Sequence, residues 1–288
     1  MSSSASSLPP LPSDRPGLPG TRVEIVRSPS HPPRVRAVLF DFDGTLSLIR
    51  EGWPEVMIPM LVDELLRTPR AESEEELRRV VEDFVMRLNG KQTIYQMIQL
   101  AEEVTRRGGT PQEPVEYKHE FQRRLLQRIE GRTTALRQGR VDPQDLMVPN
   151  ALPLLESLRD RGLPLFLASG TDLVYVQQEL AALGLDHFFG DRVWGAIDAH
   201  QNFSKKMVVD RLVADLDLQP GELLGFGDGF VEIQEVHRVA GVAVGVASDE
   251  QHRVAINDWK RNRLIEAGAD LIVPDYRDLQ PLLTHLLG

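Results

Sequence analysis

The fold is decided by one stretch of the sequence, Val35-Arg36-Ala37-Val38-Leu39-Phe40-Asp41-Phe42-Asp43-Gly44-Thr45-Leu46. A short apolar run ends there in two carboxylates one residue apart, followed by a glycine and a hydroxyl. The run is typical of a buried strand, because parallel strands covered on both faces are apolar almost throughout. Open α/β sheets bind their ligands at the carboxyl ends of the strands. We therefore expect Asp41 and Asp43 to lie in a ligand crevice.

The two carboxylates predict a bound cation. Two anions this close repel each other unless a cation or a proton separates them. Mg²⁺ prefers oxygen ligands, takes one or two carboxylates and completes its shell with water and substrate phosphate. Gly44 allows a sharp turn that brings backbone N–H groups close to an anion. The alternative is a plain acidic turn after a strand, since Asp-Gly is a common turn dipeptide.

Composition excludes several classes of protein. The chain has 288 residues, a net charge of −10, 41% hydrophobic residues and no cysteine. The net charge of −10 argues against a general binder of nucleic acids or anionic membranes, because such a protein would need a basic face. The lack of cysteine excludes disulfides, thiolate metal sites and cysteine nucleophiles. No apolar run is long enough to span a bilayer and no secretion signal is evident, so the sequence predicts a soluble, cytoplasmic protein.

The chain divides into three kinds of sequence. Residues 1–34 are rich in serine and proline, which predicts a disordered tail. Residues 48–148 carry helical patterns almost throughout, and they predict a helical cap inserted into an α/β core of residues 35–47 and 149–288. The expected cap helices cover 55–66, a segment opened by the capping box Ser73–Glu76, 93–107 and a segment beginning at Pro114.

Strand and helix alternate again from Asn150 onwards, which predicts a doubly wound, Rossmann-like parallel sheet. Polar residues follow two of these strands: Ser169 and Gly170 in Leu-Ala-Ser-Gly-Thr, and Asp228 in Gly-Asp-Gly. Lys205 and Lys206 stand in the first turn of a helix expected over 204–216. Each has an ordinary explanation, as a helix cap, a turn or a solvated charge. Their common place at the ligand-binding edge of the sheet favours a phosphate site.

These motifs together resemble the haloacid dehalogenase superfamily over residues 35 to about 285. Asp-Phe-Asp-Gly-Thr-Leu is similar to its motif I, and Ser169 to motif II. Lys205 fits motif III best, with Lys206 as the alternative. Asp228 and Glu232 are similar to motif IV, although the family often has aspartate where Glu232 stands. The resemblance also implies a helical cap between motifs I and II.

The resemblance implies a two-step phosphoryl transfer. Asp41 would attack phosphorus to give an aspartyl-phosphate, and Asp43 would protonate the leaving oxygen and then deprotonate water. Mg²⁺ would be held by Asp41, by Asp43 through its backbone carbonyl, and by Asp228; Glu232 would hold a metal-bound water or the Lys205 ammonium. The phosphate oxygens would be bound by Ser169, Gly170, Lys205 and the backbone N–H groups of the Phe42–Thr45 loop, which includes Gly44 and Thr45. The second aspartate argues against dehalogenation, which has no leaving alkoxide to protonate.

We expect the cap to determine which substrates bind. Asn89-Gly90-Lys91-Gln92-Thr93 joins two cap helices, and the resemblance implies that such a loop descends into the active site. We hypothesise that Lys91, Gln92 and Thr93 contact the part of the substrate outside the phosphate; a solvated connection is the alternative. Arg50 and Trp53, which follow motif I closely, are candidates for the entrance, and a place in the core of the cap is the alternative for Trp53.

Three functions fit these motifs. The first is a Mg²⁺-dependent phosphatase acting on a small phosphorylated metabolite such as a sugar phosphate. The second is a phosphomutase that uses the same Asp41 and Asp43. The third is a non-catalytic protein that binds a phosphorylated ligand, against which the intact set of polar residues counts. The sequence predicts neither the substrate nor the oligomeric state.

Overall fold

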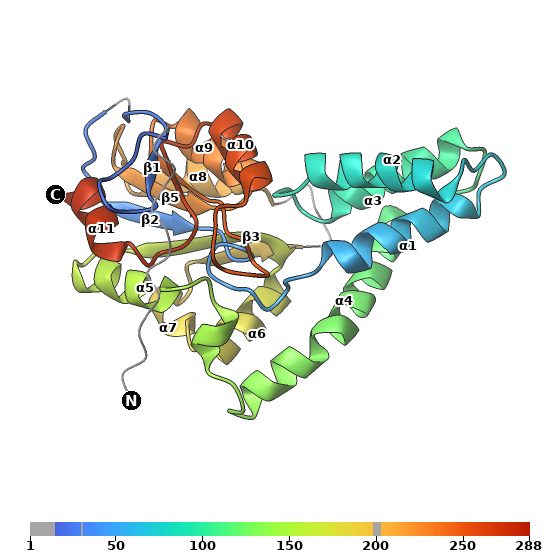
Figure 1. Ribbon diagram of the computed structural model, residues 1–288, viewed down its shortest axis with the longest axis horizontal. Helices are drawn as coiled ribbons and strands as arrows, with labels where there is room; N and C mark the ends of the chain where they lie inside the picture. Colours follow the sequence, from blue (N-terminus) through green and yellow to red (C-terminus); the bar gives the residue numbers. More distant parts are fainter. Residues whose placement is uncertain (1–14, 30, 198–202) are drawn as a thin grey trace.

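The computed structural model describes residues 15–29, 31–197 and 203–288. A seven-stranded sheet with helices on both faces forms the core, and a group of helices projects from one side of it (Figure 1). The strand order is β1-β7-β6-β5-β2-β3-β4. The strands are β1 (Glu24–Ile25), β2 (Ala37–Phe40), β3 (Leu165–Asp172), β4 (Val193–Ala196), β5 (Leu223–Gly227), β6 (Val242–Val246) and β7 (Leu271–Val273).

Strand β2 has the buried position that its apolar sequence predicts. All four of its residues are buried, and it pairs in parallel with β3 on one side and β5 on the other. Val38 and Phe40 face one helical layer, whereas Ala37 and Leu39 face the other, as the two-residue period of a strand requires. Phe40 stacks on Phe226 of β5 with ring centroids 4.9 Å apart. The carboxyl ends of β2, β3 and β5 therefore lie at one edge of the sheet.

Two helical layers cover the core sheet. The first layer packs on Val38 and Phe40, and the second packs on Ala37 and Leu39. The first contains α5 (Ala151–Asp160), α6 (Leu173–Leu183), α7 (Asp186–Phe189) and α11 (Leu279–Leu287), and the second contains α8 (Lys205–Asp215), α9 (Phe230–Arg238) and α10 (Asp258–Ala267). The prediction of a doubly wound α/β core is confirmed.

The helical cap lies between β2 and β3 in the sequence, as predicted, and Figure 1 shows it beside the core. The capping box is present: the Ser73 hydroxyl accepts the Glu76 N–H, and the Glu76 carboxylate accepts the Ser73 N–H. The cap helices are α1 (Pro54–Leu66), α2 (Glu74–Arg87), α3 (Ile94–Arg106) and α4 (Pro114–Arg137), followed by a short 3₁₀ helix, Pro143–Leu146.

The prediction of a disordered tail over residues 1–34 is wrong for residues 15–29, and residues 1–14 lie outside the described part. Strand β1 extends the sheet by pairing with β7, and it does so antiparallel, so the sheet is not purely parallel. Arg22 forms a two-bond ion pair with Asp275, at 2.9 and 3.1 Å. Such pairings join residues about 250 positions apart in the sequence, so composition alone did not reveal them.

The cap and core helices are too short or too polar to cross a bilayer, within the residues that the structure describes.

Candidate active site

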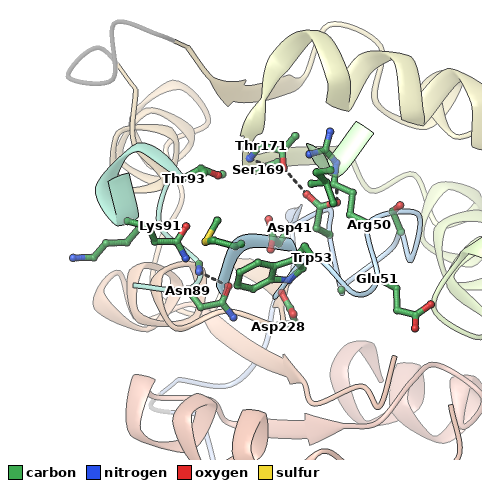
Figure 2. Close-up of a pocket in the computed structure, with 18 of the residues that line it drawn as sticks. Asp41, Arg50, Glu51, Trp53, Asn89, Lys91, Thr93, Ser169, Thr171 and Asp228 are labelled. Carbon is green, nitrogen blue, oxygen red and sulfur yellow. Dashed lines mark hydrogen bonds and ion pairs between the residues drawn. The ribbon is translucent and has the colours of Figure 1, made fainter. Parts of the chain in front are cut away.

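The polar residues at the ends of β2, β3 and β5 converge on one cavity of about 100 Å³ between core and cap. Asp41 follows β2, Ser169 lies in β3, Asp228 follows β5 and Lys205 begins α8. Figure 2 shows the Trp53 ring between Asp41 and Asp228 in this view. The cavity is lined on the cap side by Trp53, Met57, Asn89, Gly90, Lys91, Thr93, Gln96, Phe121 and Leu125.

Lys205 is the lysine that enters the site. Ser204 caps α8 by accepting the Met207 N–H, and this start of the helix directs Lys205 inwards. The Lys205 ammonium lies 2.8 Å from an Asp41 oxygen and 2.8 Å from a Glu232 oxygen, and all three side chains are buried. Burial disfavours the charge, but the two carboxylates outweigh it and raise the pKa of Lys205. Lys206 is exposed and pairs with Asp210.

Asp41 is a buried carboxylate in a mixed field of charges. Burial raises the pKa of Asp41 well above its usual value, whereas the Lys205 ammonium acts in the opposite direction. The neighbouring carboxylates of Glu232 and Asp228 add to the increase. A further cation near Asp41 would favour its ionised, nucleophilic form.

Asp43 is held by a different set of groups. The Thr171 hydroxyl donates to Asp43 Oδ2 at 2.8 Å, and the Arg50 guanidinium lies 3.8 Å from Oδ1. Arg50 is itself fixed by Glu179, to which it donates with Nε and Nη2. Burial raises the pKa of Asp43 to about 6, and Arg50 opposes this increase. A carboxyl with this pKa exchanges protons near neutral pH, as a general acid and base must.

One oxygen from each of Asp41, Asp228 and Glu232 falls within a cluster whose atoms lie within 4.8 Å of one another. An all-carboxylate donor set suits a hard divalent cation such as Mg²⁺. The Asp43 carboxylate is outside this cluster, so only its backbone remains as a predicted metal ligand. Both Glu232 oxygens already have partners, the Gly229 N–H at 2.5 Å and the Lys205 ammonium. Of the two predicted roles of Glu232, holding Lys205 is the one that these contacts favour.

In the loop after Asp41, fewer backbone N–H groups are available to a phosphate than the sequence predicts. Gly44 has a φ of +74°, and a Cβ there would lie 2.2 Å from Asp228 Oδ2, so the position requires glycine. The N–H groups of Gly44 and Thr45 donate to the carbonyls of Ser47 and Phe42. The expectation that they bind phosphate is therefore wrong in this conformation, and the N–H groups of Phe42 and Asp43 are the remaining candidates. The buried Thr45 hydroxyl makes no hydrogen bond within the described chain.

The cap loop enters the site by its backbone. A Cβ on Gly170 would lie 2.9 Å from the Lys91 carbonyl oxygen, so the loop rests directly on the strand end that carries Ser169. The Lys91 side chain points away from the cavity (Figure 2), and its ammonium lies 5.8 Å from the centre of the Tyr95 ring. The buried Gln92 donates to the Phe203 carbonyl at 2.7 Å, and Thr93 lines the cavity. The structure thus does not bring the Lys91 side chain to the phosphate site.

A second lysine that contacts the acidic cluster was not predicted from the sequence. Lys260, in the first turn of α10, lies 2.8 Å from Asp228 and 2.5 Å from Glu250. Glu179, the partner of Arg50, was missed as well. Neither Lys260 nor Glu179 belongs to a motif, and both stand inside helices, where a lysine or a glutamate is ordinarily solvated.

Comparison with known proteins agrees with this arrangement. Curated relatives include proteins named phosphoglycolate phosphatase from Mannheimia succiniciproducens, 27% identical over 130 residues, and from Haemophilus influenzae, 25% identical over 141 residues. The matches cover 44% and 48% of this chain and span about half of each relative, 56% and 57%.

The fold is shared with several solved structures. A predicted phosphoglycolate phosphatase from Haemophilus somnus matches with a TM-score of 0.56 and 20% identity, covering 86% of this chain and 97% of that one. A putative β-phosphoglucomutase from Thermotoga maritima matches with a TM-score of 0.51 and 19% identity, over 88% and 100% of the two chains. A family model described as haloacid dehalogenase-like hydrolase matches residues 35–238, and this chain belongs to that family.

Proposed function

We propose that this protein is a Mg²⁺-dependent phosphomonoester hydrolase that acts in the cytoplasm on a small phosphorylated metabolite through an aspartyl-phosphate. The observation that carries the proposal is the contact of Asp41 with Lys205 beside Asp228 in a cavity that the cap lines on one side. It combines a carboxylate nucleophile, a fixed cation for the phosphate and an acidic cluster. Phosphoryl transfer depends mainly on such positioning and charge stabilisation.

The charges around the acidic cluster support a divalent cation. Two ammonium groups contact four carboxylates. Lys205 pairs with Asp41 and Glu232, and Lys260 pairs with Asp228 and Glu250. With ordinary charges on every group, this set carries two more negative charges than positive ones. A divalent cation would neutralise the excess, whereas the set without it contains buried charges that lack compensation. When bound, Mg²⁺ would reduce the repulsion between the nucleophile and the phosphate oxygens.

The chain's own residues take distinct roles. Asp41 attacks phosphorus, and the leaving oxygen departs with the proton of Asp43. Thr171 fixes Oδ2 of Asp43, and Oδ1 makes no hydrogen bond in the described chain, so Oδ1 is the atom that we assign to proton transfer. Water then attacks the phosphorus atom, Asp43 removes its proton, and Asp41 is released. Ser169, Lys205 and the Phe42 and Asp43 N–H groups hold the phosphate oxygens throughout.

Release of phosphate from a panel of phosphorylated metabolites tests the proposal. The panel should contain 2-phosphoglycolate, because two relatives carry that activity in their names, and sugar phosphates. Each compound is assayed with Mg²⁺, with a chelator and with the Asp41→Asn variant. Mg²⁺-dependent release by the wild type alone would support the hydrolase. Isomerised product without phosphate release would replace it with the phosphomutase, and binding without turnover would replace it with a binding protein.

A further inference from the structure

Lys260 is a buried charge that the proposed reaction does not use. Asn257 caps α10 by accepting the Lys260 N–H at 3.0 Å, and this fixes the lysine in the first turn of the helix. Its ammonium group contacts Asp228 Oδ2 at 2.8 Å, Glu250 Oε1 at 2.5 Å and the Ser248 hydroxyl at 3.3 Å. Its side chain is only 9% exposed. An ammonium group has three donors, and three acceptors surround it.

One of the three acceptors, Asp228, is a candidate metal ligand. Asp228 lies in a loop after β5 with a glycine on each side, so its backbone is poorly restrained by its own sequence. Lys260 holds one of its two oxygens from the side of α10, and Gly44 permits the close approach of the same carboxylate on the other side. The Ser248 hydroxyl donates to the Gly44 carbonyl at 3.1 Å and so ties this support to the Asp41 loop.

We propose that Lys260 is a positioning residue of the metal centre: it holds Oδ2 of Asp228 so that the carboxylate presents its other oxygen to a divalent cation in one orientation. The inference rests on the proposed function, because it takes Asp228 to be a metal ligand. Groups that orient metal ligands through a hydrogen bond typically change metal affinity by 10–100-fold when removed. The competing explanation is that Lys260 merely balances the charge of Glu250.

The double variant Lys260→Met, Glu250→Gln separates these explanations. It removes one positive and one negative charge together, so the net charge around the cluster stays that of the wild type. Replacing a buried ion pair by neutral groups is often tolerated, and this favours a folded protein. Mn²⁺, added to the full chain without substrate, serves as the probe, and its binding is followed by electron paramagnetic resonance. We expect the Kd to rise at least about tenfold.

Three further variants define the outcomes. Lys260→Arg keeps the positive charge but replaces the compact ammonium group with a larger, planar guanidinium. This variant should therefore also weaken Mn²⁺ binding, by at least about threefold. Lys206→Met, an exposed lysine of the same chain, should leave the Kd unchanged within about twofold. If the double variant and Lys260→Arg both bind Mn²⁺ with wild-type affinity while Asp228→Asn loses binding, the positioning role of Lys260 is overturned and the metal site is not. Wild-type affinity in Asp228→Asn would instead overturn the metal site of the proposed function.

Discussion

The substitution Asp43→Asn should make the protein more stable while it removes turnover. Burial raises the pKa of Asp43 from an ordinary 3.8 to about 6. The folded protein therefore keeps this proton to a higher pH than the unfolded chain does, and the free energy of unfolding falls as the pH rises from about 4 to about 6. Above pH 6 the native state contains a carboxylate that is worse solvated than it would be in the unfolded chain. Asparagine removes this penalty and still accepts the Thr171 hydrogen bond.

The structure sets the size of the effect. A pKa difference of this size corresponds to about 3 kcal/mol at neutral pH. The Asp43 side chain is 28% exposed, so water screens part of the penalty and about 1–2 kcal/mol is the expected gain. The gain should fall to roughly half at pH 5 and disappear below about pH 3, where the wild-type carboxyl is protonated in both states.

Urea unfolding at pH 7.5, 6 and 5, followed by circular dichroism, measures this gain directly. Asp191→Asn is the matched control, because Asp191 is an exposed aspartate and its replacement should change the free energy of unfolding by less than about 0.5 kcal/mol at each pH. Two results would refute the linkage between burial and the Asp43 proton. The Asp43→Asn variant would be less stable than the wild type at pH 7.5, or it would be more stable by an amount that does not depend on pH.

Three other substitutions test the site. Lys205→Met should lower kcat/KM at least about a hundredfold and the free energy of unfolding by about 3 kcal/mol, because it leaves Asp41 and Glu232 buried without their cation; Lys206→Met is the control for both measurements. Arg50→Met should lower the free energy of unfolding by about 3–5 kcal/mol in urea, and adding Glu179→Gln should restore most of it, since the partner charge is then removed too. Gly170→Ala places a methyl group 2.9 Å from the Lys91 carbonyl oxygen of the cap loop, so steady-state kinetics should show a raised KM. Unaltered kinetics would contradict the close contact between Gly170 and this loop.

The sequence predicted the core of the site because strand ends are recognisable locally. The apolar run before Asp41 and the runs before Ser169 and Asp228 identify parallel strands, and the geometry of a parallel sheet then brings their carboxyl ends together. Helical periodicity likewise identified the cap. The choice between Lys205 and Lys206 needed the structure, because helical phase within one turn depends on where Ser204 caps the helix.

Other features depended on contacts between distant segments. Lys260 reaches Asp228 across 32 residues, and nothing in the first turn of α10 distinguishes an inward lysine from a solvated one. The Lys91 loop was expected to contribute side chains, yet it touches Gly170 through its carbonyl, and a backbone contact has no signature in residue type. Strand β1 was missed for a related reason, since a two-residue strand is too short to show a period and its segment is rich in proline.

The pairing of β1 with β7 bears on how the chain folds during synthesis. Glu24 pairs with Ile272, so β1 leaves the ribosome long before its partner β7 has been made. The helical cap has mostly local contacts and can form early, whereas β1 must wait for β7. Until then the edge of β7 that β1 covers remains open, and unpaired strand edges promote association between chains. Removal of residues 1–27 should therefore increase aggregation during refolding more than it lowers the equilibrium stability of the folded protein.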